Sequence, residues 1–110
     1  MIQRLLVHEG VSAVCRYRDD GSMQEGYGLL DHASLQRLAR FARDYHYMLL
    51  ANADQLSVFS EMPGWTPTRG WMVFGGSHTV LGYSNLVCVM ENDSQPLNDM
   101  IANLAELSDL

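Results

Sequence analysis

Apolar residues recur through the middle of the chain with a helical period. From Asp31, a suitable N-cap residue, the sequence contains no glycine or proline until Pro63. The residues of the stripe, at alternating spacings of three and four, are Leu35, Leu38, Ala42, Tyr45, Leu49, Asn52, Leu56 and Phe59. This pattern predicts one long helix, or two nearly collinear helices broken near Asn52.

A second apolar set on this predicted helix lies off the main stripe. Its members are Phe41, Met48, Leu50 and Met62. A continuous helix of roughly thirty residues is about 45 Å long, whereas a compact domain of this size is roughly 35 Å across. The helix therefore needs apolar partners on two faces. We expect one partner to be the domain's own sheet and the other to be a second copy of the chain.

Strand patterns precede and follow the long helix. Asp20-Gly21 separates two extended runs, which predicts a hairpin with strands at about 11–18 and 22–27. After the helix, turns at Gly75-Gly76 and Ser84-Asn85 separate three short runs, which predicts three consecutive antiparallel strands. The last of these runs, LVCVM, is apolar throughout, as expected of a strand that is buried on both faces.

Short helices are expected at both ends of the chain. Residues 2–8 form a short helix or turn closed by Gly10, and Pro96 opens a helix whose apolar residues share one face. The predicted order is αββαβββα, an α+β fold with one five-stranded antiparallel sheet and helices packed on it. With 110 residues and 47% hydrophobic content, we expect residues 1–110 to form a single domain.

The charge of the chain argues against two classes of partner. All seven basic residues are arginines, and thirteen carboxylates give a formal net charge of -6. An acidic domain without a clustered basic stripe lacks the electrostatics for binding nucleic acid or an anionic membrane surface. The N-terminal apolar run is too short for a signal peptide and no later run is long enough to span a bilayer, so we expect a cytoplasmic protein.

The sequence offers little catalytic or cofactor chemistry. A P-loop is excluded because the chain has no lysine, and GGSH is typical of a hairpin turn rather than a phosphate site. The four histidines are scattered, no C-x-x-C pair occurs, and no metal or cofactor is predicted. A nucleophilic pair of His78 with Cys15 or Cys88 is an alternative. Both cysteines lie in apolar runs, which favours inert core thiols and no catalytic residues.

Arginines cluster on the long helix. Arg40 and Asp44 stand at positions i and i+4, with Arg37 and Arg43 nearby, which is typical of a solvated face with weak ion pairing. The alternative is a patch that receives an acidic partner or supplies an arginine finger to a bound GTPase. Asn52 either fixes the register between paired helices or marks the end of the helix.

Both tryptophans lie in one segment, MPGWTPTRGWMVFGG. Its prolines and glycines favour a rigid corner that leads the chain from the long helix into an edge strand. In the competing interpretation, Trp65, Arg69 and Trp71 form a binding surface, because Trp and Arg are enriched at interface hot spots.

The whole pattern resembles the roadblock/LC7 superfamily. The first hairpin, GVSAVCRYRDDGSMQEGYG, is similar to the opening hairpin of these proteins. The later segments PTRGWMVFGG and PLNDMIANL resemble a small prokaryotic branch of the superfamily that has no assigned function. The resemblance implies the sheet order 2-1-5-4-3 and a homodimer in which the third strands pair across a two-fold axis beside the long helices. In this order strands one and five are neighbours, which suggests that Cys15 and Cys88 approach each other. It also implies no enzymatic activity, since relatives are dynein accessory chains, partners or activators of small Ras-like GTPases, or scaffold subunits.

The function expected from the sequence is that of a noncatalytic homodimeric interaction or regulatory subunit. Its partner would be a small Ras-like GTPase or a metabolic complex. The residues expected at a dimer or partner interface are Phe41, Met48, Asn52, Trp65, Arg69 and Trp71. The alternative is a small-ligand sensor that uses the Trp65/Trp71 segment and the cleft between helix and sheet.

Overall fold

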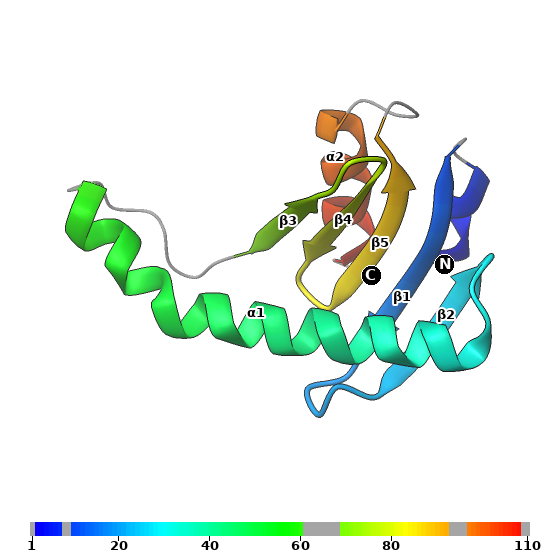
Figure 1. Ribbon diagram of the computed structural model, residues 1–110, viewed down its shortest axis with the longest axis horizontal. Coiled ribbons are helices and arrows are strands. Elements are labelled where there is room, and N and C mark those ends of the chain that lie inside the picture. The colour runs from blue at the N-terminus through cyan, green and yellow to red at the C-terminus, as the bar shows by residue number, and fades with distance from the viewer. Residues whose placement is uncertain (1, 8–9, 61–68, 93–96, 109–110) are drawn as a thin grey trace.

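The computed structural model describes residues 2–7, 10–60, 69–92 and 97–108 (Figure 1). The elements in chain order are the 3-10 helix η1 (Ile2–Val7), β1 (Val11–Tyr17), β2 (Met23–Gly28), α1 (His32–Ser60), β3 (Gly70–Phe74), β4 (His78–Tyr83), β5 (Leu86–Glu91) and α2 (Leu97–Ser108). The predicted order αββαβββα is confirmed, with a 3-10 helix as its first element.

The strands form one antiparallel sheet in the order β2-β1-β5-β4-β3. This is the order that the roadblock/LC7 resemblance implied. β1 and β5 lie at the centre of the sheet, and β2 and β3 form its two edges. The chain therefore brings its N-terminal hairpin and its C-terminal strand together, and leaves the strand after the long helix at an edge.

Local sequence explains the first hairpin. Gly21 has a φ of 88°, the left-handed conformation that glycine adopts most readily. The Asp20 carboxylate accepts hydrogen bonds from the Ser22 backbone N–H at 2.8 Å and from its hydroxyl at 2.6 Å. These bonds hold the turn where Asp20-Gly21 predicted it.

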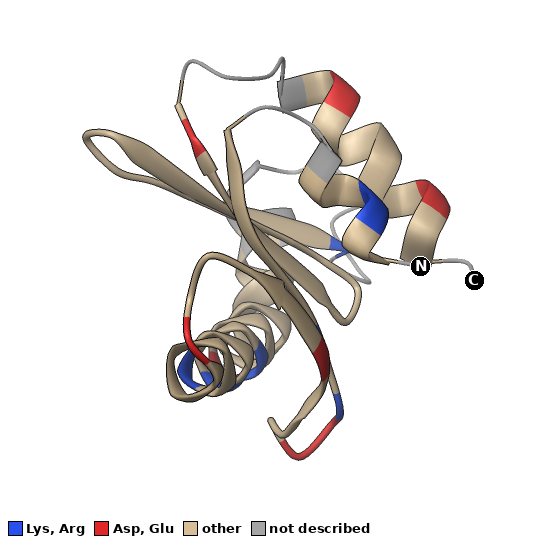
Figure 2. Cartoon of the chain, turned by 90° about the vertical axis from the view of Figure 1, so that its right-hand side faces the viewer, with Lys and Arg blue, Asp and Glu red and all other residues tan. Residues whose placement is uncertain are grey.

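Helices cover both faces of the sheet. α1 crosses one face, and α2 and η1 cover the other (Figures 1 and 2). β5 shows the alternation clearly: Cys88 and Met90 join the core under α2, whereas Val87 joins the core under α1. The apolar run LVCVM is thus a strand with a buried row on each face, as predicted.

α1 is one continuous helix of 29 residues, without a break at Asn52. The Asp31 carboxylate caps it by accepting a hydrogen bond from the Ser34 N–H at 2.7 Å. Leu35, Ala39 and Ala42 are buried against the sheet. At 1.5 Å per residue the helix is about 43 Å long, and its C-terminal part extends past the edge of the sheet at β3 (Figure 1).

The two cysteines lie on neighbouring strands but on opposite faces of the sheet. In the β1–β5 register Val14 is opposite Cys88 and Cys15 is opposite Val87, so Cys15 faces α1 and Cys88 faces α2. Both thiols are free and fully buried. Burial raises the pKa of Cys15 to about 11 and that of Cys88 to about 12. The expectation that both thiols lie in the core is confirmed, whereas the suggested approach of the two thiols is wrong.

Candidate interaction surface

The residues that the sequence proposed for an interface lie on α1 and at the start of β3. Phe41, Met48 and Asn52 belong to α1, and Arg69 and Trp71 lie at β3. Trp65 lies outside the described residues. α1 and β3 are neighbours at one edge of the domain (Figure 1), so the fold brings the described candidates into one region.

α1 exposes a set of large apolar side chains that its own sheet leaves uncovered. Phe41 is 43% exposed and Met48 is 48% exposed. Among the described side chains of this helix, the exposed large apolar residues are Phe41, Tyr47, Met48, Leu50 and Val58. At 3.6 residues per turn, Phe41 and Met48 lie on one face of α1, whereas Tyr47, Leu50 and Val58 point in other directions. Isolated exposed apolar residues are common on soluble proteins, but two that share a face beside an edge strand can form part of a surface that another chain covers.

Trp71 connects the edge strand to the helix. Its indole ring lies 5.9 Å from the ring of Phe41 and 4.8 Å from the ring of Tyr45, measured between centroids. Only 8% of Trp71 is exposed, and its ring nitrogen has no hydrogen-bond partner among the described residues. Trp71 therefore packs as part of the corner between α1 and β3, and the accessible part of this aromatic cluster belongs to Phe41.

β3 presents an open edge. It pairs with β4 over its whole length, and no described strand pairs with its other side. Met72, Val73 and Phe74 are all exposed, with 62% of Phe74 accessible. The sequence analysis did not single out these residues, because an apolar run such as WMVF is typical of a buried strand. The exposed edge that they form was implied only through the resemblance.

The polar candidates are exposed. The Asn52 side-chain amide donates a hydrogen bond to the Met48 carbonyl at 2.7 Å, one turn back in the same helix, so Asn52 does not end the helix. Arg69 is exposed, and its backbone carbonyl accepts a hydrogen bond from the Ser84 N–H at 2.9 Å.

The arginine cluster on α1 is partly engaged within the chain. Arg43 donates to the Asp19 carbonyl at 2.9 Å and to the Asp44 carboxylate at 3.0 Å, and its guanidinium lies 4.2 Å from the centre of the Tyr47 ring. Asp44 thus pairs with Arg43 and not with Arg40. These contacts hold the β1–β2 turn against α1, which matches the solvated face with weak ion pairing.

The described residues do not assemble a nucleophilic pair. His78 is opposite Glu91 and is exposed, whereas Cys88 is opposite Leu81 and faces the core under α2. Because side chains alternate along a strand, His78 and Cys88 lie on opposite faces of the sheet. Cys15 lies on the same face as His78, but in the register it is level with Gly82, four residues from His78 along β4. No group of three or more His, Cys, Asp or Glu side chains is placed to hold a metal within the described ranges. Among the helices described, none is long and apolar enough to cross a membrane.

Comparison with known proteins identifies the family of this chain. A family model described as "Uncharacterized conserved protein (DUF2173)" matches residues 1–106. The chain belongs to the DUF2173 family. A search of curated proteins found no significant match to this DUF2173 protein.

Two solved structures share the fold of this DUF2173 chain. A roadblock/LC7 domain from Streptomyces avermitilis is 14% identical, with a TM-score of 0.65, over 78% of this chain and 70% of that one. MglB from Myxococcus xanthus is also 14% identical, with a TM-score of 0.70, over 96% of this chain and 84% of that one. The DUF2173 protein therefore has a roadblock/LC7 fold.

Proposed function

We propose that this DUF2173 protein is a noncatalytic homodimeric interaction or regulatory subunit of the cytoplasm, with residues 1–110 as one domain. The observation that carries the proposal is the pair of exposed apolar residues Phe41 and Met48 on α1 beside the open edge of β3. The two features adjoin at the Trp71–Phe41 contact, so a second copy placed there covers both at once.

The two features suit a symmetric pair of chains. An edge strand with free backbone groups readily pairs with its own copy in antiparallel orientation, because a two-fold axis places each strand against the other. The same axis brings the two α1 helices together, so that Phe41 and Met48 pack against their counterparts. The overhanging part of α1 then lies over the partner's domain, which accounts for a helix longer than the sheet that supports it.

The proposed partner of the dimer is another cytoplasmic protein, a small Ras-like GTPase or a metabolic complex. The support is the roadblock/LC7 resemblance, because relatives in that superfamily are partners or activators of small Ras-like GTPases, or scaffold subunits, and have no enzymatic activity of their own. The burial of both thiols and the separation of His78 from Cys88 agree with a noncatalytic role. We also propose that the protein comes from the prokaryotic branch of the superfamily named in the sequence analysis.

Sedimentation equilibrium tests the dimer. The molecular mass measured for the wild-type protein is expected to be twice the 12.4 kDa of one chain. Met48→Asp places a carboxylate in the proposed interface and is expected to shift the protein to monomer. Leu29→Asp is the matched control, because Leu29 is 87% exposed and lies in the loop after β2, at the far edge of the sheet from β3.

A monomeric wild type at micromolar concentration contradicts the dimer. Equal dissociation of both variants shows that the effect is not specific to α1. Native mass spectrometry of complexes isolated from the producing cells tests the partner. An additional polypeptide that is present with wild type and with Leu29→Asp but absent with Met48→Asp supports a role that depends on this surface.

A further inference from the structure

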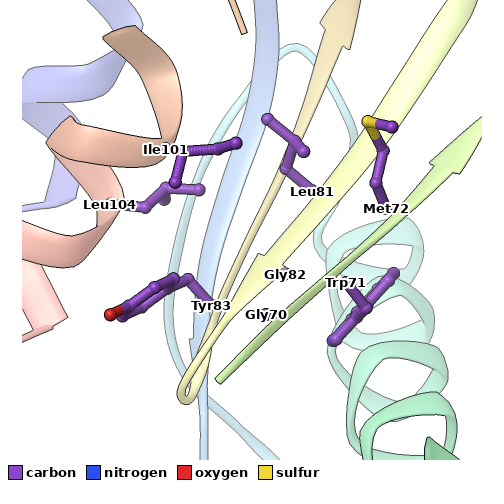
Figure 3. A pocket seen from close by; sticks show the side chains of 8 residues that line it. All are labelled: Gly70, Trp71, Met72, Leu81, Gly82, Tyr83, Ile101 and Leu104. Atoms are coloured by element: carbon purple, nitrogen blue, oxygen red, sulfur yellow. The ribbon is translucent and has the colours of Figure 1, made fainter. Parts of the chain in front are cut away.

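An apolar pocket lies on the opposite face of the sheet from α1, between α2 and the β3–β4 hairpin (Figure 3). Met72, Leu81, Tyr83, Ile101 and Leu104 line it, together with Gly70, Trp71 and Gly82. Figure 3 shows Ile101, Leu104 and Tyr83 on one side of the hairpin and the Trp71 ring on the other, toward α1. The pocket therefore lies on the α2 face of the sheet, away from the exposed residues of α1.

The pocket is large enough to hold a small molecule. Its volume is about 370 Å³, within the range of roughly 300–1,000 Å³ that is typical of ligand sites. An engineered apolar cavity of about 150 Å³ already stays dry and binds benzene. A space more than twice that size accommodates a fused aromatic ring system or a medium-length aliphatic chain.

A missing side chain keeps the floor of the pocket open. Gly70 is opposite Tyr83 in the β3–β4 register, so a side chain at Gly70 would stand on the pocket side of the sheet. A Cβ there would lie 3.1 Å from the Gly82 carbonyl oxygen and 3.4 Å from the Tyr83 ring. Gly70 therefore leaves room that any other residue would partly fill.

The rim of the pocket is also apolar. Met72 is 45% exposed and Ile101 is 41% exposed, and they project from β3 and α2 at its mouth. No charged side chain is among the described residues that line it. A charged ligand would lose its hydration here and would meet no charged partner, only the polar groups of Tyr83 and Trp71, which is costly. A neutral apolar molecule would bury its surface favourably.

We propose that this pocket binds an uncharged apolar small molecule, one per chain. The site gives the small-ligand alternative of the sequence analysis a different location, since most of its walls come from α2 and the α2 side of the hairpin, and Trp71 is only one of its lining residues. It goes beyond the proposed interaction role and does not depend on it, because α2 and α1 cover opposite faces of the sheet.

Titration with N-phenyl-1-naphthylamine, a neutral dye that brightens in apolar surroundings, tests the proposal. The wild-type protein is expected to bind the dye saturably with one site per chain. Ile101→Trp fills the mouth of the pocket and is expected to weaken binding at least tenfold. Leu29→Trp is the control, because it places the same ring at an exposed position after β2, at the opposite edge of the sheet from β3, and it is expected to bind like wild type.

A second pair of measurements tests the ligand class and guards against misfolding. Ile101→Ala opens the mouth without filling it and is expected to keep dye binding within threefold of wild type. Decanol is expected to displace the dye at least tenfold better than decanoate, because the described walls offer no charged partner for a carboxylate. Absence of saturable binding to the wild type, equal losses in Ile101→Trp and Leu29→Trp, or equal displacement by decanol and decanoate would overturn the proposal.

Discussion

The indole ring of Trp71 occupies the space in which a side chain at Gly82 would stand. The two residues are directly opposite each other on β3 and β4, and a Cβ built at Gly82 collides with the Trp71 ring. The ring can lie flat on the sheet beneath Phe41 and Tyr45 because its neighbour has no side chain. Gly82 is therefore part of the corner that joins α1 to the edge strand.

Gly82→Ala is expected to destabilise the protein by about 1–3 kcal/mol, as overpacking of a filled site does. The matched control is Gly76→Ala in the β3–β4 turn, where a Cβ meets nothing within 4 Å. The control is expected to stay within about 0.5 kcal/mol of wild type. Urea unfolding followed by tryptophan fluorescence measures both. Equal midpoints for the two variants would show that the ring adjusts without loss.

Arg16 is expected to anchor the C-terminal end of α2. Its guanidinium donates hydrogen bonds to the Leu107 carbonyl at 3.2 Å and to the Asn85 side-chain oxygen at 3.3 Å, and it lies 3.8 Å from the Glu25 carboxylate. Arg16→Met leaves these acceptors without their donor and is expected to cost about 1–3 kcal/mol.

The control for Arg16→Met is Arg37→Met, since Arg37 is exposed and bonds only to the Ser34 hydroxyl on its own helix among the described contacts. It is expected to change the free energy of unfolding by about 0.5 kcal/mol or less. Amide hydrogen exchange separates a local effect from a global one. Faster exchange confined to the last turn of α2 identifies Arg16 as its anchor, whereas unchanged exchange there contradicts this role.

Both cysteines are expected to resist alkylation in the folded protein. The pKa of about 11 for Cys15 compares with 9.0 for an unperturbed thiol, so its thiolate is about a hundredfold scarcer at pH 8. The pKa of about 12 for Cys88 makes its thiolate scarcer still. Mass spectrometry after iodoacetamide treatment compares the rate of cysteine alkylation in the native protein with the rate in guanidinium-unfolded protein. Native labelling of Cys88 at a rate near the unfolded one would revive the nucleophile hypothesis.

Stability is expected to fall at high pH for the same reason. A folded-state pKa raised above the unfolded value means that the unfolded chain loses its thiol protons first. The contribution of the two thiols is therefore complete below pH 9 and is lost as the pH rises toward 11 and 12. Urea midpoints measured between pH 7 and pH 10 are expected to be level at first and then to fall above pH 9. A midpoint that rises above pH 9 would contradict this.

The cap of α1 is expected to respond to acid. The hydrogen bond from the Ser34 backbone N–H lowers the pKa of Asp31 below its usual 3.8. A lowered pKa adds stability that is present above pH 3.8 and is lost as the pH falls through the folded-state value. Asp31→Ala is expected to destabilise the helix at pH 7, whereas Asp31→Asn keeps the cap without this pH dependence. Circular dichroism during thermal unfolding at pH 7 and pH 3 compares the three proteins.

Local signals in the sequence were sufficient for most of the fold. Asp20-Gly21 and the Asp31 cap act through contacts within a few residues, so the sequence identifies them directly. The apolar period likewise predicted α1, but it left a break near Asn52 open. The structure resolves that alternative, since the Asn52 amide bonds to its own helix and permits the next turn.

Relationships between distant segments were harder to predict. Which face a thiol occupies depends on the register between β1 and β5, and a shift of one residue reverses every side chain. That register shifts between Val11 and Ala13, and no local signal marks the irregularity. Arg16 donates hydrogen bonds to Asn85 and Leu107, which are 69 and 91 positions later in the sequence, so its role follows only from the tertiary structure. The pocket likewise could not be predicted from the sequence, because it forms only when α2 is placed over β3 and β4.

The two edges of the sheet differ in a way that limits growth. β2 carries the charged Glu25, an irregular register opposite Arg16 and Tyr17, and Gly28 with a φ of 131°, and such features discourage a further strand from pairing. β3 is apolar and regular along its length. When only one edge of a sheet can accept another strand, no site for adding further strands remains once that edge is paired. The same strand order that exposes β3 thus protects the protein against open-ended polymerisation into fibres.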